Sequence, residues 1–330
     1  MTRHVRIAGW GKCLPSQILS NYDLEKMVDT SDEWIRTRSG ISERRVISEE
    51  ETTSTIATSA AQEAMEKAGI GPKDLDLIIL ATLTPDYPGL PATASLVQHA
   101  LGAPNCGAFD LAAGCSGFVY GLVTGSQLVL SGAYRHILVI GAEALSRVID
   151  WTDRTTCVLF GDAAGAVVLS ATDQEGGLLS SVLGSDGSGA QHLIIPAGGS
   201  RVPASRESVE QRQHYIKMNG REVFKFAARI LPRVFNESLE KAGVKAKDVD
   251  LLIPHQANIR IIDSARESLS MGEEAVYVNV DRYGNTSAAS IPVALCEAID
   301  EGKVKPGSLL AFVAFGAGLT WGSALWRWQG

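Results

Sequence analysis

The sequence predicts an α/β protein made of two related halves. Apolar runs that suit buried strands alternate with stretches of helical periodicity along the 330 residues. One strand-and-helix pattern returns half a chain later, and unbroken apolar strands joined by helices indicate largely parallel sheets covered on both faces. We therefore expect two halves packed face to face, with a site where equivalent strand ends meet.

The clearest repeat is a helix end, a glycine, a short loop and a buried strand. It occupies residues 66–79 and returns at 240–253, with Glu-Lys-Ala-Gly opening both copies. A looser echo pairs 105–115 with 275–287. Because a solenoid would repeat every 20–50 residues, one duplication at half length predicts two similar domains, 1–173 and 174–330.

Periodicity places the individual elements. Expected strands, from short apolar runs, are 5–9, 75–81, 106–111, 136–141, 164–170, 178–184, 249–254, 275–279, 309–315 and 322–328. Expected helices, from apolar residues at helical spacing, are 52–68, 92–101, 117–131, 220–242, 259–269 and 287–301. Gly69 and Gly243 follow two of these helices, where glycine readily closes the last turn. The polar stretch 197–213 is expected to form a surface loop.

Composition excludes several classes of function. A net charge of -7 without clustered basic residues argues against nucleic-acid binding. No apolar run reaches the roughly 18 residues of a membrane span, and the first 15 residues lack the apolar core of a signal peptide. The five cysteines are widely spaced without a CxxC pair, which argues against disulfides or a zinc site and predicts a cytoplasmic location: Cys13, Cys106, Cys115, Cys157 and Cys296.

Cys115 is the candidate nucleophile. It lies among small residues between an expected strand and an expected helix. A thiol at a helix N-terminus experiences partial positive charge, which favours the thiolate, so we expect a lowered pKa. The alternative is an inert core cysteine, which is the commoner fate of such a residue.

Two polar residues stand at related places in the second half. His255 follows the second copy of the repeated strand, where the first copy has Ala81. Asn285 lies in the turn that corresponds to the Cys115 turn, and the two turns converge if the halves are related by a pseudo-twofold axis. The alternatives are a histidine in a helix-capping turn and an ordinary turn asparagine.

Two glycine-rich segments do not match a dinucleotide or phosphate site. Residues 160–166 and 315–319 lack the third glycine, the acidic residue and the P-loop lysine that those sites require. We expect close backbone packing there, or a backbone N–H directed at an oxyanion.

Five ordered motifs together resemble β-ketoacyl-acyl carrier protein synthase III, the initiating condensing enzyme of type II fatty acid synthesis. They lie at 29–35, 110–118, 254–258, 284–290 and 318–324, so the resemblance spans nearly the whole chain. It implies the thiolase fold, with two duplicated α/β halves in a five-layer α-β-α-β-α sandwich.

The resemblance also implies a mechanism. Cys115 would be the nucleophile and would take an acyl group from acyl-CoA, with His255 and Asn285 completing a Cys-His-Asn triad. Malonyl-acyl carrier protein would then lose CO₂ and attack the acyl thioester. Two side-chain donors, each worth about 2–4 kcal/mol, would stabilise the thioester oxygen, and the backbone N–H groups of Cys115 and Ala317 would form the second oxyanion hole. The resemblance implies no metal, flavin or nicotinamide cofactor.

The resemblance also assigns the substrate sites. Trp34 and Arg154 would stack on the adenine of CoA, Arg38 would lie near its phosphates, and Asn258 would line the pantetheine tunnel. Without the resemblance, Trp34 would read as a helix anchor. Leu90 stands where some members carry a phenylalanine that closes the acyl pocket across a homodimer, which suggests longer or branched primers.

An acidic carrier protein requires a basic patch on this acidic chain. Arg221, Lys225 and Arg229 lie at i, i+4 and i+8 of an expected helix, and Arg260 extends the group. The alternative is an ordinary solvated helix face.

Other functions remain open. A relative of the same fold could use a specialised starter in polyketide or other secondary metabolism, and it would share the triad. A non-catalytic partner subunit would have lost Cys115, His255 or Asn285, yet all three are present. A cysteine hydrolase would need a positioned water, for which the sequence offers no clear site.

Overall fold

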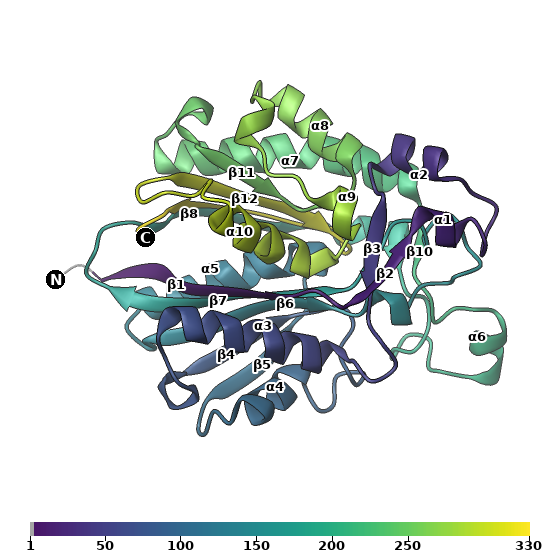
Figure 1. Ribbon diagram of the computed structural model, residues 1–330, viewed down its shortest axis with the longest axis horizontal. Helices are drawn as coiled ribbons and strands as arrows, with labels where there is room; N and C mark the ends of the chain where they lie inside the picture. The colour runs from purple at the N-terminus through teal and green to yellow at the C-terminus, as the bar shows by residue number, and fades with distance from the viewer. Residues whose placement is uncertain (1–2) are drawn as a thin grey trace.

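The chain folds into five layers. The computed structural model describes residues 3–330. Two sheets lie roughly parallel with α5 and α10 between them, while α3 and α4 cover the outer face of one sheet and α7 and α8 cover the other (Figure 1). Apolar side chains from both sheets and both central helices form one continuous core in the middle layer. The expected five-layer α-β-α-β-α order is therefore observed.

Each sheet comes from one part of the chain. The first sheet has the order β1-β7-β6-β4-β5, with bounds His4–Cys13, Ala163–Thr172, His136–Glu143, Leu77–Ala81 and Gly107–Leu111. The second has the order β11-β12-β13-β8, with bounds Leu251–Pro254, Leu309–Gly316, Thr320–Arg327 and Gly177–Ser185. The chain thus passes from one sheet to the other between Thr172 and Gly177.

The sheets are mixed, so the prediction of largely parallel sheets is wrong. β4 pairs in parallel with β5 and β6, and β11 pairs in parallel with β12. All other pairs within the two sheets are antiparallel. The reason is the connections: β12 reaches β13 through a tight turn, which can join only antiparallel neighbours, whereas parallel pairs need a crossover.

The principal helices match the sequence prediction closely. Their bounds are Thr53–Ala68 (α3), Thr93–Leu101 (α4), Gly117–Leu130 (α5), Gly220–Ala242 (α7), Ile259–Ser268 (α8) and Ser290–Asp300 (α10). The repeat is also present as local structure: α3 ends at left-handed Gly69 and α7 at left-handed Gly243. A 3-10 turn, Pro72–Asp74 or Ala246–Asp248, then leads into β4 or β11.

Residues 275–279 do not form the expected strand. They run beside β11, with one isolated bridge between Leu252 and Val276. The buried Gln256 side chain replaces the missing pairing, since its amide donates to Tyr277 O (3.0 Å) and accepts from Asn279 N (3.0 Å). A side chain here makes the hydrogen bonds that a neighbouring strand would make, and the periodicity of apolar residues in the sequence cannot reveal such a replacement.

Several small elements escaped the sequence prediction. A hairpin of β2 (Gln17–Ser20) and β3 (Glu43–Val46) encloses α1 (Asn21–Leu24) and α2 (Asp32–Ser39). The polar stretch 197–213 is largely a loop, as expected, but it contains the short helix α6 (Arg206–Glu210), which protrudes from the body (Figure 1). Other short elements include β9 (Leu193–Ile194), β10 (Lys217–Met218) and α9 (Val280–Tyr283). In the described part of the chain, no helix has both the length and the apolar character to cross a membrane.

Candidate active site

Cys115 lies in a tight turn between β5 and α5. The turn is the 3-10 segment Gly114–Ser116, directly before Gly117 opens the helix. Gly114 has φ +59°, and a Cβ there would lie 2.6 Å from Ala317 O, so only glycine fits. The sequence thus places the thiol at the helix N-terminus through a turn that a larger residue could not make.

The segment after β12 packs against this turn. A Cβ on Gly316 would lie 2.3 Å from Cys115 N, so glycine is needed here for close backbone approach. The contact brings the backbone N–H groups of Cys115 and Ala317 to the Cys115 sulfur. The glycine-rich segment 315–319 therefore packs as expected, as does Gly161, whose Cβ would lie 2.4 Å from Tyr283 O.

The prediction of a lowered Cys115 pKa is wrong for the resting site. The residue is only 5% exposed, and burial raises the pKa of its thiol to about 12. The Ser287 side chain and the N–H groups of Cys115 and Ala317 oppose this only in part. A charged sulfur loses its hydration here, so the resting residue is a neutral thiol that must lose its proton during acyl transfer.

His255 follows β11 and is buried beside the thiol turn. Its N–H donates to Val313 O (2.8 Å), and its ring packs edge-on against Phe315 at 5.4 Å. Nδ1 lies 2.7 Å from Ser290 Oγ, whereas buried Nε2 has no partner among residues 3–330. Burial lowers the pKa of His255 to about 3, so the imidazole is neutral at physiological pH.

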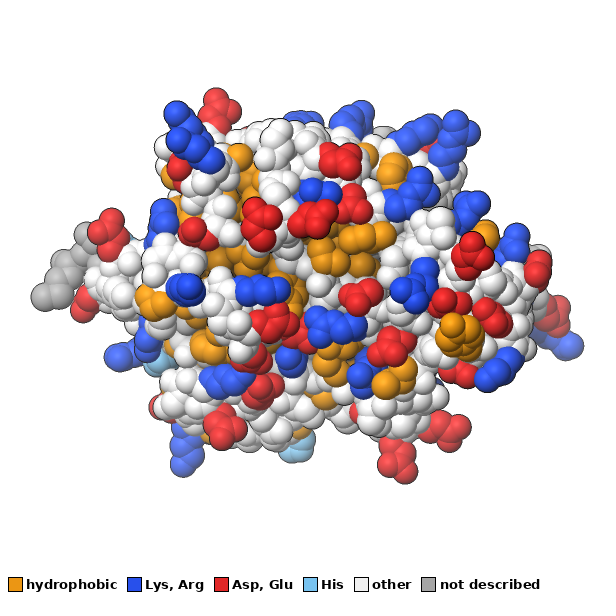
Figure 2. All heavy atoms as spheres, turned by 45° about the horizontal axis from the view of Figure 1, so that its top comes forward, with side chains coloured by type: hydrophobic (Ala, Val, Ile, Leu, Met, Phe, Trp, Pro, Cys, Tyr) orange, Lys and Arg blue, Asp and Glu red, His pale blue; other side chains and the backbone are white. Residues whose placement is uncertain are grey.

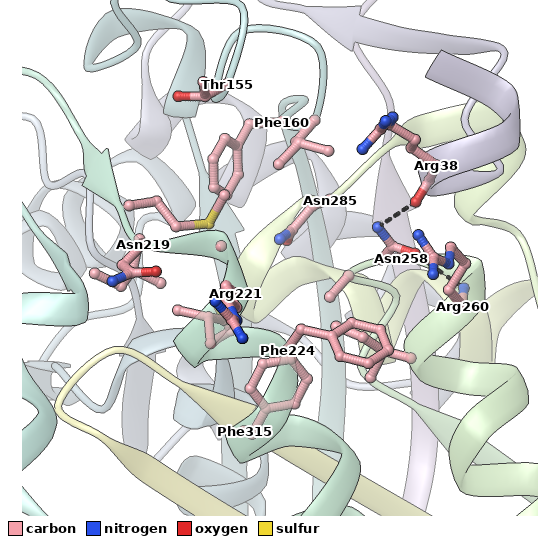
Figure 3. A pocket seen from close by; sticks show the side chains of 18 of the residues that line it. Arg38, Thr155, Phe160, Asn219, Arg221, Phe224, Asn258, Arg260, Asn285 and Phe315 are labelled. Atoms are coloured by element: carbon pink, nitrogen blue, oxygen red, sulfur yellow. Dashed lines mark hydrogen bonds between the residues drawn. The ribbon is translucent and has the colours of Figure 1, made fainter. Parts of the chain in front are cut away.

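Asn285 is held by backbone hydrogen bonds to a neighbouring strand-like segment. Its N–H donates to Leu159 O (2.8 Å), and its carbonyl accepts from Gly161 N (3.1 Å). The side-chain Oδ1 accepts from Ser287 N (2.9 Å). That bond assigns the amide orientation and leaves the NH₂ group free to donate into the cavity, where Figure 3 shows the side chain near Phe160.

The three candidate catalytic residues share one cavity. A cavity of about 960 Å³ is lined by Cys115, His255 and Asn285 at its inner part. A second, apolar cavity of about 240 Å³ is lined by Leu83, Thr84, Cys115, Leu145, Val148, Phe160, Leu193, Ile194, Ile195, Ile216, Ser287 and Ala317. Cys115 therefore lies where a large open cavity meets a small apolar one.

The candidate CoA residues lie at the outer part of the large cavity. Trp34, Arg38 and Asn258 line it, and Asn258 Nδ2 donates to Arg38 O (3.0 Å; Figure 3). The Arg154 guanidinium lies 5.5 Å from the Trp34 ring centre and donates to Asp29. A base stacked between Trp34 and Arg154 needs two contacts of about 3.5–4.0 Å, one on each face, and together these exceed the observed separation. A base can therefore enter between the two side chains only if the arginine moves.

The candidate carrier-protein patch surrounds the same opening. Arg221, Lys225 and Arg260 are exposed and line the large cavity, while exposed Arg229 lies one turn further along α7. Lys225 pairs with Glu222 at 2.7 Å, which reduces its free charge. Elsewhere acidic and basic side chains are interspersed, as the face in Figure 2 shows.

Leu90 lies outside both cavities of its own chain. It is 87% exposed in the loop before α4 and lines neither cavity. An acyl pocket that includes Leu90 therefore needs a second copy of the chain.

Sequence reasoning missed the residues that shape the small cavity and support His255. Phe160, Ile195 and Ile216 lie in loops and Leu193 in the two-residue strand β9, all too short to show a periodic pattern in the sequence. Ser290 lies within the motif at 284–290, but only its contact with His255 reveals a role. Among residues 3–330, no three His, Cys, Asp or Glu side chains are grouped to hold a metal ion.

We expect Gly316→Ala to impair acyl transfer and condensation by roughly 10²–10³-fold, the loss typical of a damaged oxyanion hole. The added methyl would push the Ala317 segment away from Cys115 N. Acyl-enzyme formation from acyl-CoA measures the effect, and thermal melting separates it from unfolding. Gly199→Ala is the control, because a Cβ there meets nothing within 4 Å. An unchanged rate in a folded Gly316→Ala enzyme would argue against the Ala317 N–H as an oxyanion donor.

Comparison with known proteins agrees with the motif resemblance. Residues 109–187 match the family model of 3-oxoacyl-[acyl-carrier-protein] synthase III, and residues 239–328 match the model of its C-terminal part. A beta-ketoacyl-[acyl-carrier-protein] synthase III of Symbiobacterium thermophilum is 57% identical over 99% of this chain and 98% of its own.

Solved structures extend the comparison. The 3-oxoacyl-[acyl-carrier-protein] synthase III of Aquifex aeolicus VF5 has a TM-score of 0.91 at 51% identity, over 98% of this chain and 100% of that chain. A priming beta-ketosynthase from the R1128 polyketide biosynthetic pathway has the same TM-score, 0.91, at only 34% identity, over 99% and 97% of the two chains.

Proposed function

This chain belongs to the 3-oxoacyl-[acyl-carrier-protein] synthase III family of thiolase-fold condensing enzymes, and we propose that Cys115, His255 and Asn285 carry its reaction. The enzyme is an acyltransferase that initiates fatty acid synthesis by forming a carbon–carbon bond. The observation that carries the residue assignment is the position of Cys115 at the junction of two cavities, together with His255 and Asn285.

The first half-reaction loads Cys115. The pantetheine arm of acyl-CoA enters the large cavity and places its acyl chain in the small apolar one. The Cys115 sulfur attacks the thioester carbonyl, the backbone N–H groups of Cys115 and Ala317 stabilise the oxyanion, and CoA leaves as the free thiol. The neutral, buried resting thiol suits this step, because the proton it loses is the one that CoA needs.

The second half-reaction forms the carbon–carbon bond. Malonyl-acyl carrier protein places its thioester oxygen near His255 and Asn285, whose donors stabilise the enolate left when CO₂ departs. The enolate carbon attacks the acyl thioester, the Cys115 sulfur is expelled as a thiolate that takes up a proton from solvent to restore the neutral thiol, and 3-oxoacyl-acyl carrier protein leaves. No step requires a metal, flavin or nicotinamide cofactor.

The test of this function is mass analysis of the intact enzyme. Incubation with acyl-CoA should add one acyl group, peptide mapping should locate it on Cys115, and malonyl-acyl carrier protein should remove it as 3-oxoacyl product. An adduct at another residue, or hydrolysis of the acyl-enzyme in place of condensation, would overturn the assignment. The second result would favour the hydrolase alternative.

We propose that the enzyme is a cytoplasmic homodimer and that its two halves are residues 1–173 and 174–330. Five free cysteines support the location, and the passage of the chain between sheets after Thr172 supports the division. Exposure of Leu90, which lies outside both cavities of its own chain, supports a pocket completed by a second copy. The specialised-starter alternative is less favoured, because the polyketide enzyme is 34% identical to this chain, whereas the synthase III enzymes of Symbiobacterium thermophilum and Aquifex aeolicus are 57% and 51% identical.

The small cavity suggests the primer. Water occupies roughly 30 Å³ per molecule and a methylene group is of similar size, so 240 Å³ has room for more than an acetyl group. We expect acyl-enzyme from isobutyryl-CoA and hexanoyl-CoA as well as acetyl-CoA, and a shift toward acetyl-CoA in Leu90→Phe. Competition among the three, followed by intact mass, measures this. A strict acetyl preference in the native enzyme would contradict it.

The basic patch suggests the carrier-protein site. We expect the double variant Lys225→Glu/Arg229→Glu to raise KM for malonyl-acyl carrier protein about ten-fold and to weaken its salt dependence, with little change in acyl transfer from acyl-CoA. Lys245→Glu/Lys247→Glu, at the loop beyond α7, makes the same charge change as a control. Equal effects of the two double variants would assign the loss to overall charge and not to this patch.

A further inference from the structure

Ser290 contacts the edge of the His255 ring that faces away from the substrate cavity. Its Oγ lies 2.7 Å from Nδ1, at the start of α10. The same oxygen accepts the backbone N–H of Gln256 at 3.3 Å. All three groups are buried, so water does not compete for these bonds.

The direction of the Ser290 hydrogen bond follows from its partners. The Gln256 N–H can only donate, so Ser290 Oγ accepts there. Among residues 3–330, His255 Nδ1 is the only acceptor within hydrogen-bond distance of the Ser290 hydroxyl. The hydroxyl therefore donates to Nδ1. A neutral imidazole carries one ring proton, which must then reside on Nε2.

The opposite tautomer leaves a buried group unpaired. With the proton on Nδ1, the ring would donate to Ser290 Oγ, and the serine hydroxyl would lose its only acceptor. A buried donor without a partner is unfavourable, and the folded site offers it no other contact. Nε2, by contrast, has no protein partner in the described chain and lies at the cavity, where substrate can supply an acceptor.

We propose that Ser290 is a positioning residue that fixes His255 as the Nε2–H tautomer, so that the ring donates a hydrogen bond into the cavity and accepts none there. The inference rests on the proposed role of His255. It adds the hydrogen bond that orients the His255 ring. Asn285 has a comparable support, because Ser287 N–H donates to its Oδ1 and leaves its NH₂ group to donate, so both side chains are oriented as donors.

The Nε2–H tautomer gives His255 a role in the second half-reaction and none as a base in the first. An Nε2–H donor suits the developing enolate oxygen, but it cannot accept the Cys115 proton. In acyl transfer the carbon–sulfur bond to Cys115 forms, the bond to the CoA sulfur breaks, and the proton passes from the Cys115 sulfur to the departing CoA sulfur without residing on His255. Loss of Ser290 should therefore affect decarboxylation more than loading.

The tautomer can be measured without activity. Long-range proton–nitrogen NMR of enzyme labelled at its six histidines distinguishes protonated from unprotonated ring nitrogens, and His255→Gln identifies the His255 signals. We expect an unprotonated Nδ1 and a protonated Nε2 in the native enzyme, and a mixture in Ser290→Ala. A protonated Nδ1 in the native enzyme would overturn the proposal even if Cys115, His255 and Asn285 are catalytic.

Kinetics provide the second test. CO₂ release from carboxyl-labelled malonyl-acyl carrier protein by preloaded enzyme should fall roughly ten-fold in Ser290→Ala, the factor that about 1.4 kcal/mol corresponds to, with KM unchanged. Loading from acyl-CoA should change less than about two-fold, a smaller effect than the loss of one hydrogen bond gives. Ser290→Thr keeps the hydroxyl and should restore most of the decarboxylation rate.

A buried serine elsewhere supplies the control. Ser126 in α5 donates only to Leu122 O within its own helix, so Ser126→Ala should leave both rates unchanged. The proposal would be overturned if Ser290→Ala lost loading and decarboxylation equally. It would also be overturned if folded Ser290→Thr failed to restore activity, since Ser290 would then have only a structural role. If Ser290→Ala does not fold, the native NMR result and Ser290→Thr still decide the question.

Discussion

Replacing Cys115 by alanine should abolish acyl-enzyme formation and condensation. Among residues 3–330, no other nucleophile lines both cavities with the backbone donors that a tetrahedral intermediate needs. We expect no acyl adduct by intact mass and a condensation rate at the detection limit. Since His255 and Asn285 remain, the variant should still release CO₂ slowly from malonyl-acyl carrier protein.

Cys106→Ala is the matched control for this substitution. Cys106 is also a free, buried cysteine, but it precedes β5 at the end remote from the Cys115 turn and lines neither cavity. Native activity in Cys106→Ala and none in Cys115→Ala would assign the chemistry to one sulfur. Acyl adducts that persist in Cys115→Ala would refute the proposed nucleophile.

Replacing Asn285 by aspartate should slow decarboxylation by at least 10²–10³-fold, the cost of losing one oxyanion donor. Aspartate keeps an oxygen that can accept from Ser287 N, so the turn should survive. It replaces the donating NH₂ by an oxygen that repels the enolate. Loading of Cys115 should persist, because that oxyanion uses backbone N–H groups. Separate assays of loading and of CO₂ release measure the two effects.

Asn219→Asp controls for charge in the same cavity. Asn219 lines the large cavity and caps α7 by accepting from Glu222 N, a role that aspartate performs equally well. A small effect of Asn219→Asp beside a large effect of Asn285→Asp would assign the loss to the donor. Similar losses in both variants would show only that added negative charge in the cavity inhibits.

The fold was largely predictable where local pattern sets the structure. Helix α7 begins and ends at the predicted residues because its apolar stripe is long and Gly243 closes it. The duplicated helix-glycine-strand pattern produced matching local structures in both halves. Strand direction was less predictable, because the same apolar run suits a parallel or an antiparallel neighbour, and the connection decides between them.

The candidate site was predictable as a set of residues but not as an environment. Cys115 and Asn285 stand out in sequence because they lie in corresponding turns of the two halves, and His255 because it follows the repeated strand where the first copy has Ala81. The expected pKa of Cys115 was wrong, since helix position is a local property, whereas burial of the thiol comes from segments far along the chain such as Gly316, which packs against Cys115 N. The lining of the small apolar cavity was not foreseen, because it comes from loops, single 3-10 turns and the two-residue strand β9.

By itself the sequence determined the duplication, and its motif resemblance implied the five-layer α/β order and the three side chains that come together. The duplication follows from periodicity, glycine placement and residue type, which are properties of neighbouring residues. Only the tertiary structure decided the burial of the thiol, the meeting of two cavities at Cys115 and the hydrogen bonds that direct His255 and Asn285. These features depend on Ser290, on Ser287 and on the turn after β12 at Gly316, which come together at the site because the two halves pack against each other.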